Sequence, residues 1–185
     1  ASGGTINITN CYSTGFIEGN SAGGICGRTF GQGDLIVDQA NIIINISQCY
    51  STGDIGYNSS NVNQGGIFGS IIGFVSKNLT VNIDECYSTG RIGKGGGGIC
   101  GGESGKSSDS ITLNVNNCYS LGQIETLAGG IYGEDTGLNA TNITTINATN
   151  CYTVGTITSS NTGIYGLSNN GGTTTNCISE EDNTW

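Results

Sequence analysis

A seven-residue motif, Cys-Tyr-Ser-Thr-Gly-x-Ile, returns at regular intervals along this chain of 185 residues. We call it the cysteine motif. It begins at five cysteines in recognisable form and at a sixth in degenerate form: Cys11, Cys49, Cys86, Cys118, Cys151 and Cys177. Successive full copies lie roughly 32–38 residues apart, a spacing typical of solenoids, propellers and other repeat arrays. We therefore predict that residues 1–185 form a single segment of stacked repeats.

The residues before each cysteine alternate between apolar and polar. Apolar side chains stand five residues before it (Ile6, Ile44, Val81, Leu113, Ile146) and three before it (Ile8, Ile46, Ile83, Val115, Ala148). Asparagine always stands between these two columns: Asn7, Asn45, Asn82, Asn114 and Asn147. A period of two is the pattern of a half-buried strand.

The residue directly before the cysteine is asparagine in four of the six copies, as at Asn10 and Asn117. Asparagine tolerates a left-handed backbone, so the sequence predicts a bend there. With the bend, the cysteine, the serine and the later isoleucine point inward, and the tyrosine and threonine point outward. Without it, the tyrosine would be buried instead. We favour the bent register.

A second repeated block reads Gly-Gly-Ile-x-Gly, at 23–27, 65–69, 97–101 and 129–133, with a variant at 162–166. Its isoleucine predicts another inward column: Ile25, Ile67, Ile99, Ile131 and Ile164. The residue after that isoleucine varies between cysteine, phenylalanine and tyrosine. The stretches between block and motif are polar or rich in glycine and are predicted to be surface loops.

One repeat has an apolar face and nothing to cover it, whereas stacked repeats bury that face continuously. We therefore predict an all-β fold, a right-handed parallel β-solenoid of about five coils, with one coil per repeat of roughly 32–38 residues. A β-propeller is the alternative. It is disfavoured because a blade needs four comparable strands and each repeat supplies about three.

The alternation of Gly-Gly-Ile-x-Gly with Asn-Cys-Tyr-Ser-Thr-Gly-x-Ile resembles the GLUG-type repeats of large secreted and surface proteins, which are often adhesin-like. The resemblance covers nearly the whole chain through its five copies, although such repeats more usually carry Gly-Gly-Leu-Val-Gly. It implies an extracellular or cell-surface β-solenoid that serves as a stalk or adhesive region of a longer protein. It implies no active site.

Charged residues make up only 10% of the chain, and the formal net charge is -9. Nucleic acids need rows of Lys and Arg, which five basic residues do not supply, so we expect no nucleic-acid partner. No apolar run reaches the roughly 18 residues of a membrane span. The chain starts at Ala1 without a signal peptide, so we expect any targeting segment to have been removed or never included.

The sequence offers no catalytic, cofactor or metal site. Residues 101–107 approach a phosphate-binding loop, but Cys100 stands where that loop needs its first glycine, and no helical pattern follows. No two cysteines are two to four residues apart, as zinc sites require. The acidic residues are scattered and histidine is absent, so we expect no enzyme.

The cysteines admit two interpretations. Stacked coils place neighbours about 5 Å apart, within disulfide reach, and three pairs follow: Cys11–Cys49, Cys86–Cys118 and Cys151–Cys177. The alternative is that cysteine is a small buried apolar residue in a repeated position. Cys26 and Cys100 lie two coils apart, too far to pair directly.

Seven asparagines stand in Asn-x-Ser/Thr sequons: Asn7, Asn45, Asn58, Asn78, Asn139, Asn142 and Asn147. Asn58 and Asn139 fall in predicted loops, where a glycan is accommodated. Asn7, Asn45 and Asn147 belong to the asparagine column, where stacked, hydrogen-bonded amides are the alternative.

The outward tyrosine column is Tyr12, Tyr50, Tyr87, Tyr119 and Tyr152. Beside threonines, it is a platform for stacking on sugars or on another chain. The alternative is that tyrosine only covers the surface and favours strand structure. Ice binding would need unbroken ranks of threonine, and the threonine column fails at Leu121 and Val154.

We therefore expect a non-enzymatic, extracellular structural or adhesive β-solenoid segment of a surface protein or filament. Neither end resembles a solenoid cap, so we expect self-association or end-to-end stacking with further repeats, within a longer chain. The alternative function is a carbohydrate-binding module that uses the outward Tyr and Thr ladder. Its partners would be glycans or a host or neighbouring surface.

Overall fold

The computed structural model describes residues 3–31, 41–56, 63–73, 77–141, 145–158, 163–166 and 172–180. Within those ranges there is no helix, and twelve strands form two parallel six-stranded sheets. The long-strand sheet consists of β1 (Gly4–Thr9), β3 (Ile42–Ser47), β5 (Leu79–Asp84), β7 (Thr112–Asn116), β9 (Thr145–Thr149) and β11 (Gly172–Thr175). The short-strand sheet consists of β2 (Tyr12–Ser13), β4 (Tyr50–Ser51), β6 (Tyr87–Ser88), β8 (Tyr119–Ser120), β10 (Tyr152–Val154) and β12 (Ile178–Glu180).

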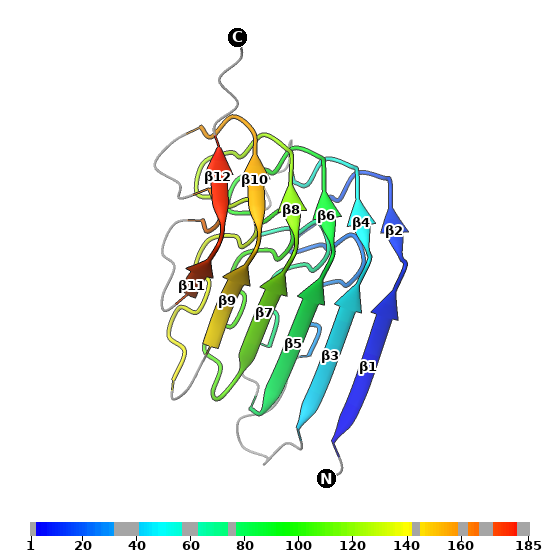
Figure 1. Ribbon diagram of the computed structural model, residues 1–185, viewed down its shortest axis with the longest axis vertical. Coiled ribbons are helices and arrows are strands. Elements are labelled where there is room, and N and C mark those ends of the chain that lie inside the picture. The colour runs from blue at the N-terminus through cyan, green and yellow to red at the C-terminus, as the bar shows by residue number, and fades with distance from the viewer. Residues whose placement is uncertain are drawn as a thin grey trace.

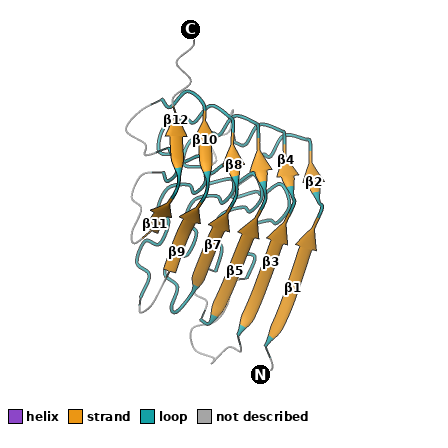
Figure 2. Ribbon diagram, in the orientation of Figure 1, coloured by secondary structure: helices purple, strands orange, loops and turns teal. Residues whose placement is uncertain are grey.

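Each coil runs through one long strand and then one short strand, and returns behind both sheets through loops (Figures 1 and 2). The return limb is held by isolated parallel bridges, such as Ile17 to Ile55 and Gly23 to Gly65. In Figure 1 the chain climbs the near side, returns behind it and advances from right to left, which makes the coils right-handed. The prediction of a parallel β-solenoid is confirmed, and the degenerate sixth copy contributes β11 and β12.

The strands pair in the register that alignment on the cysteines predicts. In the long-strand sheet Asn7 pairs with Asn45, and the asparagine column continues from strand to strand. In the short-strand sheet tyrosine pairs with tyrosine from β2 to β10. Like residues therefore stack directly on like residues, at the separation of neighbouring strands.

A left-handed residue separates the two sheets in every coil. The residue before each cysteine has a φ between 51° and 56°: Asn10, Gln48, Glu85, Asn117, Asn150 and Asn176. Beyond the bend, Cys86 and Ser88 are buried and Tyr87 is half-exposed, and the same holds at the neighbouring coils. The bent register is confirmed. Gln48 and Glu85 adopt the left-handed conformation although they favour it less than asparagine does.

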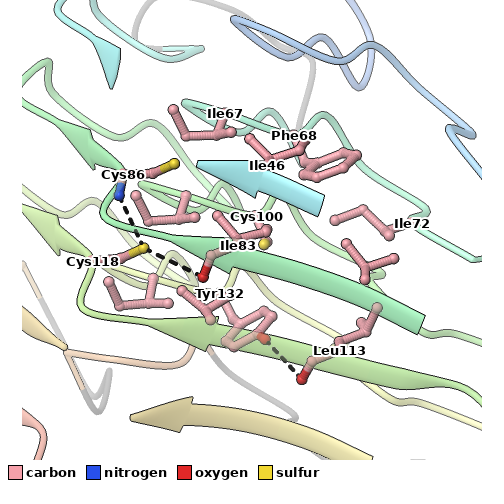
Figure 3. Packing of buried hydrophobic residues seen from close by; sticks show 14 of the residues in the cluster. Ile46, Ile67, Phe68, Ile72, Ile83, Cys86, Cys100, Leu113, Cys118 and Tyr132 are labelled. Carbon is pink, nitrogen blue, oxygen red and sulfur yellow. Dashed lines mark hydrogen bonds between the residues drawn. The ribbon is translucent and has the colours of Figure 1, made fainter. Parts of the chain in front are cut away.

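The core lies between the sheets and the return limb (Figure 3). The apolar strand columns face the isoleucines of the Gly-Gly-Ile block, and Ile67, Ile99 and Ile131 are fully buried. The variable residue after each of those isoleucines is buried as well, so two consecutive side chains of the block enter the core. Cysteine and aromatic residues alternate over the first four coils of this column, with Cys100 between Phe68 and Tyr132, and Tyr165 then follows Tyr132.

The glycine of the cysteine motif marks the closest approach between coils. A Cβ on Gly90 would lie 2.0 Å from the carbonyl oxygen of Gly53, and a Cβ on Gly122 would lie 1.8 Å from that of Gly90. Gly15, at the same position of the first coil, has no atom within 4 Å of that point. The glycine is therefore required by the preceding coil, because any side chain there would collide with main chain.

Candidate functional site

The outward tyrosines form one continuous stack along the short-strand sheet. Ring centroids are 5.3 Å apart between Tyr12 and Tyr50, and 4.9–5.0 Å apart along the rest of the column through Tyr152. The planes of neighbouring rings differ by 2–10°. Parallel in-register pairing fixes this arrangement, because each tyrosine opens its strand at the same point.

Stacking changes what the tyrosines can bind. The faces of Tyr50, Tyr87 and Tyr119 are covered by neighbouring rings, so these residues present ring edges and hydroxyl groups to solvent. Tyr12, in the edge strand β2, is 64% exposed and keeps one uncovered face. The predicted platform is therefore a row of phenol hydroxyls. Only its open end offers a ring face on which a sugar could stack.

The column formed by the residue two positions after each tyrosine contains both hydroxyl and apolar side chains. Thr14, Thr52 and Thr89 are exposed, and Leu121 is 45% exposed in the fourth coil. The column thus changes from hydroxyl to apolar along the solenoid. Ranks of threonine that could match an ice lattice are interrupted, as the sequence indicates.

The asparagine column is a ladder of hydrogen-bonded amides on the outer face of the long-strand sheet. The Nδ2 of Asn45 donates to Oδ1 of Asn7 at 2.9 Å, and the same bond, at 2.9–3.0 Å, links the later copies. The ladder ends with the Thr173 hydroxyl, which donates to Asn147. The stacked-amide interpretation is thus confirmed for three of the seven sequons, at Asn7, Asn45 and Asn147.

The other sequons differ in position. Asn139 is exposed in a turn and Asn78 is exposed just before β5. Asn58 and Asn142 lie outside the described residues. Among the described residues, Asn139 and Asn78 are therefore the exposed candidates for glycan attachment that lie outside the amide ladder.

We expect the protein, when passed through a eukaryotic secretory pathway, to carry a glycan at Asn139 and none at Asn45. A glycan on Asn45 would occupy the nitrogen that donates to Asn7 and would collide with the asparagine of the adjacent coil. Peptide mapping with and without glycosidase measures both sites. Asn139→Gln should remove the mass shift and Asn45→Gln should leave it unchanged. Full occupancy at Asn45 in folded protein would contradict this prediction.

All eight cysteines lie within the described residues, and each is a free thiol in this structure. Six of them form the predicted column. In its first three steps, from Cys11 to Cys118, the N–H of each cysteine donates to Sγ of the next at 3.4 Å, as Figure 3 shows for Cys86 and Cys118. Phe68 separates Cys26 from Cys100, as expected. The pairs Cys11–Cys49, Cys86–Cys118 and Cys151–Cys177 are neighbours without a disulfide bond.

Burial makes most of these thiols unreactive. It raises the pKa of Cys26 to about 12 and that of Cys151 to about 11, and it raises the pKa of Cys100 well above its ordinary value. The thiolate is the nucleophile, so these thiols react little near neutral pH. The column therefore serves packing and hydrogen bonding within the coil.

We expect a thiol reagent at pH 8 to modify at most Cys11 and Cys177 in the native protein, since the other six cysteines are buried. In denaturant without reductant, all eight should react. The count by absorbance and the intact mass before and after reduction check both statements. Each disulfide of the kind the sequence allows would lower the denatured count by two. A count of two would mean three disulfides, and peptide mapping would identify their partners.

The turn at 101–107 does not bind phosphate in the manner of a nucleotide-binding loop. It is followed by strand β7 and not by a helix. The Lys106 ammonium pairs with the Glu103 carboxylate and lies 3.8 Å from a carboxylate oxygen of Asp135. The lysine charge is therefore already matched by acids of the same corner.

This corner also shows that the acidic residues are not all scattered. The bridge between Cys100 and Tyr132 aligns two turns, and the N–H of Glu103 donates to the carbonyl of Glu134 at 2.7 Å. Glu103, Glu134 and Asp135 therefore gather on one corner. Alignment on the Gly-Gly-Ile block, rather than on the cysteine, would have revealed it. Burial, with the nearby Asp135 charge, raises the pKa of Glu134.

A second cross-coil pair was also missed. Asp54 and Arg91 both stand five residues after a motif cysteine, and their side chains meet at 2.8 and 3.2 Å. The Arg91 side chain, as hydrogen-bond donor, holds the pKa of Asp54 below its usual value. The pair lies at the surface, where it joins two coils.

Comparisons with protein-family models, curated proteins and solved structures yield no match to this chain. The part of the chain that the structure describes contains no helix long and apolar enough to cross a bilayer. In the same ranges, no three cysteine or carboxylate side chains converge closely enough to hold a metal ion.

Proposed function

We propose that this chain is a non-enzymatic structural or adhesive β-solenoid segment of an extracellular surface protein or filament. The observation that carries the proposal is that successive residues of the cysteine motif, and the residue before it, each have a separate structural role. The residue before it bends the chain, its cysteine and serine enter the interior, and its glycine admits the preceding coil. The motif therefore serves to build the coil. The coils expose columns of uncharged side chains to solvent.

The outer faces favour a scaffold. The amides of Asn45, Asn82 and Asn114 bond along the axis, so most of their hydrogen-bonding capacity is used within the protein. The tyrosine rings likewise contact one another. Such faces are regular and rigid, which suits a stalk or a filament that presents the same surface over many repeats.

The extracellular location rests on the exposed sequon at Asn139 and on the GLUG-type resemblance. The cysteines do not contribute to this argument, because buried thiols are compatible with any redox compartment. Partners consistent with the proposal are further repeats, a second copy, or a neighbouring surface.

Carbohydrate binding remains the second candidate, and the 64% exposure of Tyr12 with its open ring face favours it. In this case the sugar would stack on Tyr12 and bond to the phenol hydroxyls of the following rungs. The site would then lie at the open end of the short-strand sheet.

A glycan array together with electron microscopy separates the two functions. For the scaffold we expect no glycan signal above background and ordered particles or filaments. A signal that disappears in Tyr12→Ala and Tyr50→Ala, but persists in the Thr80→Ala control on the other sheet, would establish the second candidate and overturn the first.

A further inference from the structure

Main chain from three segments, at Gly95, Gly102 and Gly133, is in close contact beside the acidic residues Glu103, Glu134 and Asp135. A Cβ on Gly133 would lie 2.5 Å from both the amide nitrogen of Gly102 and the carbonyl oxygen of Gly95. Glycine is therefore required at Gly133 by its backbone neighbours. The side chains that border this junction come from Asn63, in the second coil, and from Glu134, in the fourth.

Asn63 carries a polar atom that lacks a partner. The residue is 8% exposed, and its Oδ1 is buried with no hydrogen bond to any described residue. A buried carbonyl-type oxygen without a partner costs about 1–3 kcal/mol of folding free energy. Its backbone φ of 73° is left-handed and fixes where the side chain starts. The oxygen is therefore available to a ligand or a water molecule.

Glu134 points an oxygen at the same place. A Cβ on Gly95 would lie 2.7 Å from Oε1 of Glu134 and 2.9 Å from Oδ1 of Asn63. The half-buried carboxylate makes no hydrogen bond or ion pair with the described residues. The carbonyl oxygen of Gly95 accepts the N–H of Glu134 at 3.1 Å, which leaves it a second lone pair. It is a third oxygen at this place, because it and Asn63 Oδ1 lie 2.9 and 2.5 Å from the Cβ position of Gly102.

We propose that Asn63 Oδ1, Glu134 Oε1 and the main-chain oxygen of Gly95 bind one Ca²⁺ ion. An amide oxygen, a carboxylate and a main-chain carbonyl are the donors that Ca²⁺ takes at about 2.3–2.6 Å, and water completes its six to eight ligands. The ion would give the buried amide oxygen its missing partner. It would also join the second, third and fourth coils at one point.

The charges of the corner fit a cation. Glu103 and Asp135 lie beside Glu134, and Lys106 neutralises only part of this negative charge. Lys94 is exposed and opposes binding, but it makes no ion pair within the described ranges. With one carboxylate in direct contact, we expect a dissociation constant in the range of extracellular calcium modules, about 10⁻⁴–10⁻³ M.

The test is calcium titration by calorimetry, together with thermal unfolding in 5 mM Ca²⁺ and in chelator. Two variants each weaken one of the proposed ligands. Glu134→Gln removes the charge, and Asn63→Gly removes the amide oxygen while glycine still suits the left-handed backbone. Glu18→Gln, an exposed acid of the first coil, is the matched control. Circular dichroism confirms that each variant is folded.

We expect the wild type and Glu18→Gln to bind one Ca²⁺ ion and to unfold at a higher temperature when calcium is present. Glu134→Gln and Asn63→Gly should each weaken binding at least tenfold and lose the thermal shift. Absence of heat and of a thermal shift in the wild type would overturn the proposal. Equal affinity in Glu134→Gln and the wild type would do so too. The glycan array does not depend on this result, so the two proposals fail separately.

Discussion

Gly90→Ala should lower the free energy of unfolding by more than about 3 kcal/mol, which places it among the most damaging single substitutions. The new Cβ would lie 2.0 Å from the Gly53 carbonyl oxygen and 2.4 Å from its carbonyl carbon. Both atoms are main chain, so no side-chain rotation relieves the collision. The third coil would have to separate from the second, and both sheets would lose their pairing there. Urea denaturation followed by circular dichroism measures the effect.

Gly15→Ala is the matched control, because it places the same residue at the same motif position in the first coil. No atom lies within 4 Å of its Cβ position, so we expect a change of at most about 0.5 kcal/mol. Equal stability losses in the two variants would show that the glycine is needed for backbone conformation and not for coil contact. That result would refute the steric explanation.

Tyr132→Ala should cost about 3–5 kcal/mol of stability, the range for truncating a large buried aromatic residue. The ring is fully buried and stacks on Tyr165 at 5.1 Å. Its hydroxyl donates to the carbonyl oxygens of Asn147 at 3.1 Å and Leu113 at 3.4 Å. Removal of the ring leaves a cavity at the centre of the fourth coil that the rigid stack cannot close.

Tyr119→Ala tests the same change on the outer ladder. Tyr119 is half-exposed and loses two stacking partners, Tyr87 and Tyr152, so we expect about 1–2 kcal/mol. Denaturant midpoints of the two variants, compared at equal slope, give the difference. A larger loss for Tyr119→Ala than for Tyr132→Ala would mean that the outer stack, and not the core, holds the solenoid together.

The sequence predicted the solenoid because its signals agree at several levels. The cysteine spacing, the alternating strand columns and the asparagine before the cysteine all required one coil per repeat with a bend in it. The inward column at Ile67, Ile99 and Ile131 followed from the same alignment. Each signal is local, and stacking in register repeats it from coil to coil.

Other features depend on contacts that periodicity does not encode. The residue after each block isoleucine, such as Tyr132, could face either way, and only packing across the coil determines that it is buried. The tyrosine column was predicted, but the ring rotation that covers the faces of Tyr50 and Tyr87 was not. Alignment on the Gly-Gly-Ile block would have brought Glu103 and Glu134 together, but Asn63 stands before the block of its own coil, so no single alignment places it beside them.

The amide and phenol columns have one more consequence. Identical side chains repeat every rung along the axis, perpendicular to the strands, in the geometry of cross-β fibrils. A dye that recognises this repeat in fibrils would meet the same repeat on the native surface of this chain. We therefore expect the folded, monomeric chain to enhance thioflavin fluorescence without any aggregation. A positive dye signal from this protein would report its native surface, and sedimentation would be needed to detect fibres.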